Sequence, residues 1–88
     1  MSLNFPNPSR SYYATRRAVR FWGHDSSMES TFYIAENALK GVQPDMKFDE
    51  ASILLAFDLN RELIHAAAVS AYERERRTSY DLVAADFK

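Results

Sequence analysis

The chain has 88 residues, which suits one domain with a thin core, and its 26% of charged and 47% of hydrophobic residues are ordinary for a soluble globular protein. It contains no cysteine, which excludes a disulfide framework, a thiolate nucleophile and a zinc–thiolate site. The net charge of −1 argues against a general nucleic-acid binder.

The first eleven residues contain two prolines, two asparagines and three serines. This composition predicts an irregular N-terminal arm over residues 1–11, followed by a single domain over residues 12–88. The arm lacks the basic start and apolar run of a signal peptide. No stretch approaches the ~18 consecutive apolar residues of a membrane-spanning helix. We therefore expect a cytoplasmic protein without membrane contacts.

Two strands are predicted after a short extended piece at Tyr12 and Tyr13. Residues 18–22 and 28–34 both alternate apolar and polar side chains, which is the period of a strand. The segment between them, residues 23–27, contains glycine, aspartate and two serines and is typical of a turn. Together they predict an antiparallel hairpin.

Two helices are predicted next, a short one over residues 35–40 and a long one over Asp49–Arg77. The short helix stops at Gly41. The long segment has neither glycine nor proline, and Asp49 is a good N-cap. A continuous helix would be roughly 40 Å long, so it must bend, end early or overhang. One apolar stripe would run along this helix through Ile53, Phe57, Ile64, Ala68 and Tyr72, with Leu54, Leu63, Ala67 and Ala71 alongside. If the stripe overhangs the domain, it would need a partner.

A third strand is predicted over residues 80–87. We expect it to pair with the hairpin, since a lone strand would leave its backbone groups without hydrogen bonds. The order β-β-α-α-β then predicts an α+β fold in two layers. In this fold, one short and one long helix pack on one face of a small antiparallel sheet.

Three segments carry a family resemblance: residues 18–22, residues 32–39 and residues 56–61, the last followed by Ile64 and Ala68. On these segments the chain resembles the small bacterial proteins grouped as domain of unknown function 1488, over most of residues 10–87. The resemblance implies a short, single-domain, cytoplasmic bacterial protein. It implies no catalytic or ligand residue, because the family has no assigned function.

Basic and aromatic residues are interleaved around the first strand, and they form the candidate partner-binding set Arg16, Arg17, Arg20, Trp22, Tyr12 and Tyr13. Residues 1–24 carry four arginines and no acid, whereas residues 25–58 carry seven acids and two lysines. Three interpretations stay open. The arginines pair with those acids on a solvated face, the set is a protein interface, or it stacks bases and holds phosphates.

Two other pairs suggest chemistry. Glu62 and His65 form an E-x-x-H pair with Asp58 one turn earlier, which is half of a di-iron site, but the chain has no second copy. The plainer interpretation is a solvated helix face with local pairs. His24 and Asp25 are adjacent in the predicted turn, where a proton-transfer pair would need a nucleophile or a substrate pocket within reach. A polar turn is the simpler interpretation.

These patterns predict a non-enzymatic interaction or accessory module with no cofactor and no bound metal. Its partner would be an unidentified protein or a second copy, the latter docking through the long helix or an edge strand. The alternative is a weak single-stranded nucleic-acid-binding domain that uses the basic and aromatic strand face.

Overall fold

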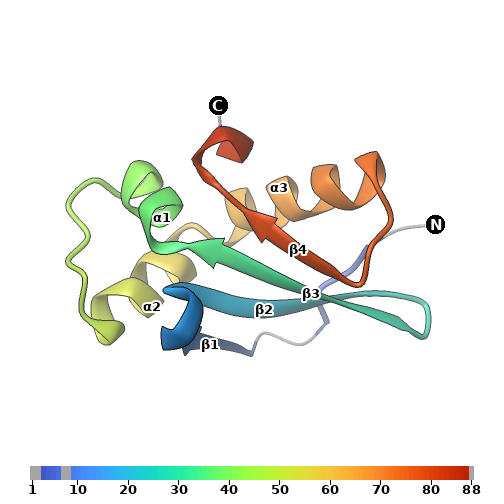
Figure 1. The fold of residues 1–88 in the computed structure, drawn as a ribbon, viewed down its shortest axis with the longest axis horizontal. Coiled ribbons are helices and arrows are strands. Elements are labelled where there is room, and N and C mark those ends of the chain that lie inside the picture. The colour runs from blue at the N-terminus through green and yellow to red at the C-terminus, as the bar shows by residue number, and fades with distance from the viewer. Residues whose placement is uncertain (1–2, 7–8, 88) are drawn as a thin grey trace.

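The computed structural model describes residues 3–6 and 9–87 and shows an α+β fold in which helices pack on one face of a single sheet (Figure 1). The expected arm residues 1–2 and 7–8, and Lys88, lie outside the described residues. In chain order the elements are β1 (Arg10–Tyr13), the 3-10 turn η1 (Ala14–Arg16), β2 (Ala18–Asp25), β3 (Met28–Ala35), α1 (Glu36–Val42), α2 (Glu50–Leu59), α3 (Arg61–Arg74), β4 (Ser79–Leu82) and the 3-10 turn η2 (Ala84–Phe87).

The strands lie in the order β1-β2-β3-β4. The predicted hairpin is present as β2 and β3, and the third predicted strand joins it as expected. The sheet is mixed rather than antiparallel, however, because β4 runs parallel to β3. The connection between them contains three helices, which is long enough for the crossover that a parallel pair requires. The α+β fold is confirmed, and the direction of the last strand is corrected.

The last strand is also shorter than predicted. It ends at Leu82, and the chain then turns through η2. The carboxylate of Asp86 accepts a hydrogen bond from the Val83 backbone N–H at 2.7 Å. This local bond takes up a donor that a longer strand would have used in the ladder, so the alternation of residues 83–87 does not produce a strand.

The hairpin is longer and its turn tighter than predicted. Only Ser26 and Ser27 separate the strands, and Ser26 has a φ of 56°. Gly23 therefore lies inside β2 and not in the turn. A Cβ atom at Gly23 would lie 2.9 Å from the Leu3 Cδ1 atom. The glycine leaves room for the N-terminal segment, which forms a β-bridge between Asn4 and His24.

The predicted long helix is two helices, α2 and α3, separated at Asn60. The Asn60 backbone N–H bonds to the Phe57 carbonyl at 3.1 Å, one residue short of the α-helical partner. The α-helical partner would be the Ala56 carbonyl, which instead accepts a hydrogen bond from the Asn60 side-chain amide at 2.8 Å. The same amide also donates to the Gln43 Oε1 atom at 3.0 Å. The asparagine thus replaces the helical hydrogen bond and breaks the helix. The predicted cap is present, because Asp49 accepts from the Ser52 N–H at 3.0 Å.

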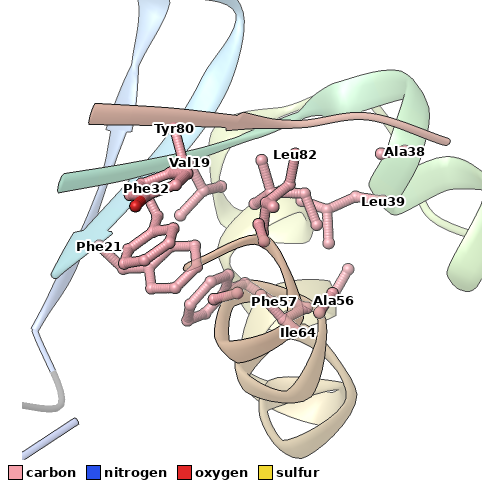
Figure 2. Packing of buried hydrophobic residues seen from close by; sticks show 14 of the residues in the cluster. Val19, Phe21, Phe32, Ala38, Leu39, Ala56, Phe57, Ile64, Tyr80 and Leu82 are labelled. Atoms are coloured by element: carbon pink, nitrogen blue, oxygen red, sulfur yellow. The ribbon is translucent and has the colours of Figure 1, made fainter. Parts of the chain in front are cut away.

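The core lies between the sheet and the helices (Figure 2). The strands contribute their inner face, and the helices contribute the predicted stripe apart from Leu63, which is 49% exposed. Figure 2 shows aromatic rings at the centre of this layer, where the Phe21 and Phe57 centroids are 5.1 Å apart. The largest fully buried side chains are Phe21, Phe32, Phe57, Ile34, Leu39, Ile53, Ile64, Leu82 and Val19. The helices pack on one face of the sheet, so the other face is not covered by helices in the described residues.

Candidate functional site

The face of the sheet that points away from the helices carries large side chains that stay partly exposed. We call it the open face and define it by Tyr13, Arg20, Trp22, Thr31 and Tyr33. The strand register sets it, since Arg20 lies opposite Tyr33 and Trp22 lies opposite Thr31. Side chains directly opposite in a ladder share a face. The surface therefore joins three neighbouring strands.

Arg20 lies at the centre of the open face, between two aromatic rings. Its Cζ atom is 5.1 Å from the centroid of Tyr13 and 5.3 Å from that of Trp22. The ring faces carry partial negative charge and attract a guanidinium at this distance. The Nε atom of Arg20 is shielded from solvent and has no hydrogen-bond partner in the described part of the chain. The rings thus hold the cation without neutralising it.

Arg16 reaches the same surface from η1. Its Cζ atom lies 4.1 Å from the Tyr33 centroid, and its Nη2 atom donates to the Asp81 Oδ1 atom at 2.7 Å. The rings of Tyr13 and Tyr33 are 5.8 Å apart, which links the two arginines through aromatic contacts. A shallow groove of about 340 Å³ lies beside Arg16, Tyr33 and Asp81. The open face therefore has exposed aromatic rings and an adjoining groove.

The other two residues of the predicted set lie elsewhere. Alternation along β1 directs Tyr12 to the helix side, where its hydroxyl donates to the carboxylate of Glu36 in α1. This hydrogen bond raises the pKa of Tyr12. Arg17 has a left-handed backbone, with φ 51°, and its Nη2 atom lies 3.4 Å from the Glu36 Oε1 atom. Glu36 is only 4% exposed, so both residues compensate a buried carboxylate and do not join the open face.

Tyr33 and Thr31 of the open face, and Asp81 at its edge, are absent from the predicted set. Alternation along residues 28–34 already places Tyr33 and the core-facing Phe32 on different faces of the strand. The missing information was the hairpin register, which sets Tyr33 beside Arg20. The position of Asp81 could be predicted only with the parallel pairing of β4, which sets Asp81 opposite Tyr33.

The side chains of the adjacent residues His24 and Asp25 lie on different faces of β2. His24 lies on the outer side, with its Nε2 atom 3.4 Å from the Glu29 Oε2 atom. Asp25 lies on the inner side, is 6% exposed, and accepts from the Tyr72 hydroxyl at 2.7 Å. Successive side chains in a strand point to opposite faces, so they form no proton-transfer pair. The proximity of Asp25 raises the pKa of Tyr72, chiefly through this hydrogen bond.

His65 and Asp58, from the segment with the E-x-x-H pair, contact different neighbours. The His65 ring stacks on Phe5, with centroids 3.9 Å apart and an interplanar angle of 7°. Asp58 is held by Arg10, whose Nη2 atom lies 2.7 Å from Oδ2, and by Arg61 at 2.7 Å. The hydrogen bond from Arg10 lowers the pKa of Asp58. The Asp58–Arg61 pair agrees with the interpretation of local pairs, whereas Asp58 and His65 also contact the distant residues Arg10 and Phe5.

Two general features of the described residues bear on what the chain can do. No group of three or more histidine, cysteine, aspartate or glutamate side chains among them has the arrangement of a metal site. Within the same residues, no helix has the length and apolar character needed to span a membrane.

The comparisons with known proteins concern the fold and the family. A crystal structure of a protein of unknown function from the DUF1488 family of Shewanella loihica PV-4 is similar, with a TM-score of 0.82 and 17% sequence identity. The match covers 92% of this chain and 91% of that one, and at this identity it shows the shared fold. No curated protein matches the sequence. A family model described as "Protein of unknown function (DUF1488)" matches residues 3–83. Because that match spans most of the chain, the protein belongs to the DUF1488 family.

Proposed function

We propose that the protein is a non-enzymatic module that binds another protein through the open face. The observation that carries the proposal is a sheet surface without helical cover in the described residues, on which Tyr13, Tyr33, Trp22 and Arg20 gather. These residue types dominate the hot spots of protein interfaces, because rigid rings bury a large area and a guanidinium supplies directed donors.

The charges around the open face favour a protein over a nucleic acid. Arg16 is neutralised by Asp81, and the exposed Glu29 lies on the same side of the sheet. A surface that binds single strands combines stacking rings with a positively charged groove along the phosphates. Here acidic residues accompany the basic ones. Nucleic-acid binding is therefore the alternative outcome of the test below.

Support for a non-enzymatic role comes from the titratable groups. The lowered pKa values of Asp49, Asp58 and Glu75 arise chiefly from hydrogen bonds with Ser52, Arg10 and Arg77 respectively. Each of these carboxyl groups has a capping or ion-pairing role, whereas catalytic groups converge on a shared pocket. We further propose that this module acts in the cytoplasm, in keeping with a sequence without cysteine.

Photo-crosslinking in living cells tests this proposal. A photoreactive amino acid replaces Thr31 on the open face or Ser70, an exposed residue of α3, as the matched control. We expect a discrete crosslinked protein from position 31 only, and its loss when Trp22→Ala is added. A crosslinked species that nuclease removes would show nucleic-acid binding instead. Equal products from both positions would contradict a specific interface.

Self-association is a second candidate, favoured by exposed leucines on the helices. Leu55, Leu59 and Leu63 are 57%, 64% and 49% exposed and are spaced by four residues. Leucines at this spacing form a common docking stripe, although the break at Asn60 shortens it. Light scattering at low and high salt tests this candidate. A dimer that persists in high salt and disappears with Leu59→Glu would support it, and a monomer would exclude it.

A further inference from the structure

We infer that the partner presents an aspartate or glutamate carboxylate to Arg20, so that the open face recognises an acidic protein segment. The inference rests on the proposed function, because it names the chemistry of the partner at the same surface. It starts from the contrast between Arg20 and the three other arginines of residues 1–24.

Each of those three arginines has a carboxylate within the chain: Arg10 with Asp58 at 2.7 Å, Arg16 with Asp81 at 2.7 Å, and Arg17 with Glu36 at 3.4 Å. Within the described residues, Arg20 has aromatic neighbours instead of a carboxylate. An aromatic ring attracts the cation without cancelling its charge. Arg20 is therefore the arginine of this group that keeps an unneutralised charge on a surface suited to docking.

The Nε atom of Arg20 adds a second reason. It is shielded from solvent and donates to no acceptor among the described residues, so the protein carries the desolvation cost of that donor. A carboxylate that approaches the edge of a guanidinium accepts two parallel hydrogen bonds, commonly from Nε and one Nη. Binding of such a group, with a small shift of the Trp22 or Tyr13 ring, would satisfy the donor and the charge together.

The neighbouring charges favour a carboxylate over a phosphomonoester, which carries nearly two negative charges at neutral pH. Asp81 and Glu29 are both exposed on this side of the sheet, with side chains 61% and 55% exposed. A dianion would be repelled by both, whereas a single negative charge centred on Arg20 meets less repulsion. The rings of Tyr13 and Trp22 would then pack on the apolar part of the acidic side chain and its neighbours.

A displayed library of random peptides tests the inference without a known partner. The library is selected on the wild-type protein, and the most enriched peptide is synthesised in two forms, one with its acidic residues and one with the corresponding amides. Fluorescence anisotropy then gives the affinity of each form for the wild type, Arg20→Gln and Trp22→Ala. Lys47→Gln, at an exposed position before α2, is the control with the same loss of charge.

We expect the selected peptides to share one aspartate or glutamate at a common position. The amide form should bind the wild type and Lys47→Gln roughly 10- to 100-fold more weakly, as for a charged hydrogen bond, and should bind Arg20→Gln as the acidic form does. If Arg20→Gln does not fold, Arg20→Lys keeps the charge but loses the fork and should lose part of the discrimination.

Two results would overturn the inference, and they are distinguishable. If binding requires Trp22 but is equal for the acidic and amide peptides, the carboxylate inference is wrong and the proposed function stands. If no selected peptide depends on Trp22, both the inference and the proposed function fail.

Discussion

The stack of His65 on Phe5 predicts a loss of stability in mild acid. Burial, aided by the nearby positive charge of Arg61, lowers the pKa of His65 from 6.5 to about 4. The unfolded chain therefore binds a proton that the folded chain rejects in the interval between these values. The contribution of neutral His65 to stability is complete above the unfolded pKa of 6.5, and it is lost as the pH falls towards 4.

The magnitude follows from that interval. A separation of about 2.5 pH units between 6.5 and 4 corresponds to at most about 3.4 kcal/mol. His65 is only partly buried, so water screens the penalty of protonation. We therefore expect the free energy of unfolding to fall by about 1–2 kcal/mol between roughly pH 7 and pH 4.5 through this residue alone.

Urea unfolding of the wild type and of His65→Phe at both pH values measures this contribution. The phenylalanine keeps an aromatic ring against Phe5 but does not titrate, so the variant should lose about 1–2 kcal/mol less than the wild type on acidification. His24→Gln provides a second background, in which adding His65→Phe should reduce the loss on acidification by the same amount, since His24 lies on the other side of the sheet. Equal pH dependence in the wild type and His65→Phe would refute the reasoning, as would an NMR titration of His65 near 6.5.

Three further predictions concern single side chains. Asn60→Ala removes two side-chain hydrogen bonds but gains helix propensity. Chemical denaturation should therefore show a net loss of about 1 kcal/mol in the free energy of unfolding, and increased stability would contradict the explanation of the helix break. Tyr72→Phe removes the donor to buried Asp25 and should cost about 1–3 kcal/mol by the same measurement, and an unchanged midpoint would show that Asp25 is solvated. Gly23→Ala should lower the melting temperature, because the added Cβ atom would contact Leu3. Leu3→Ala should then lower the melting temperature less in the Gly23→Ala variant than in the wild type, and strictly additive effects would mean that the two positions do not touch.

Much of the candidate site follows from local alternation. The pattern of residues 18–22 is sufficient to place Arg20 and Trp22 on the face opposite Val19 and Phe21, and the structure agrees. The grouping of six residues is not fully reproduced, because Tyr12 occupies the other face of β1 and contacts α1. Which strand neighbours which, and in what register, depends on pairings between distant residues, so Tyr33 could not be placed beside Arg20, nor Asp81 beside Tyr33, from one segment.

The sequence by itself determined the α+β class, the inward stripe of the helices and the N-cap at Asp49, because periodicity and capping are properties of short segments. Only the tertiary structure decided the break at Asn60, where the side chain bonds to the Ala56 carbonyl and also to Gln43 seventeen residues earlier. It also decided the parallel direction of β4 and the need for Gly23, which leaves room for Leu3. Each of these features involves a contact between segments that are far apart along the chain, and local composition does not indicate which distant groups will meet.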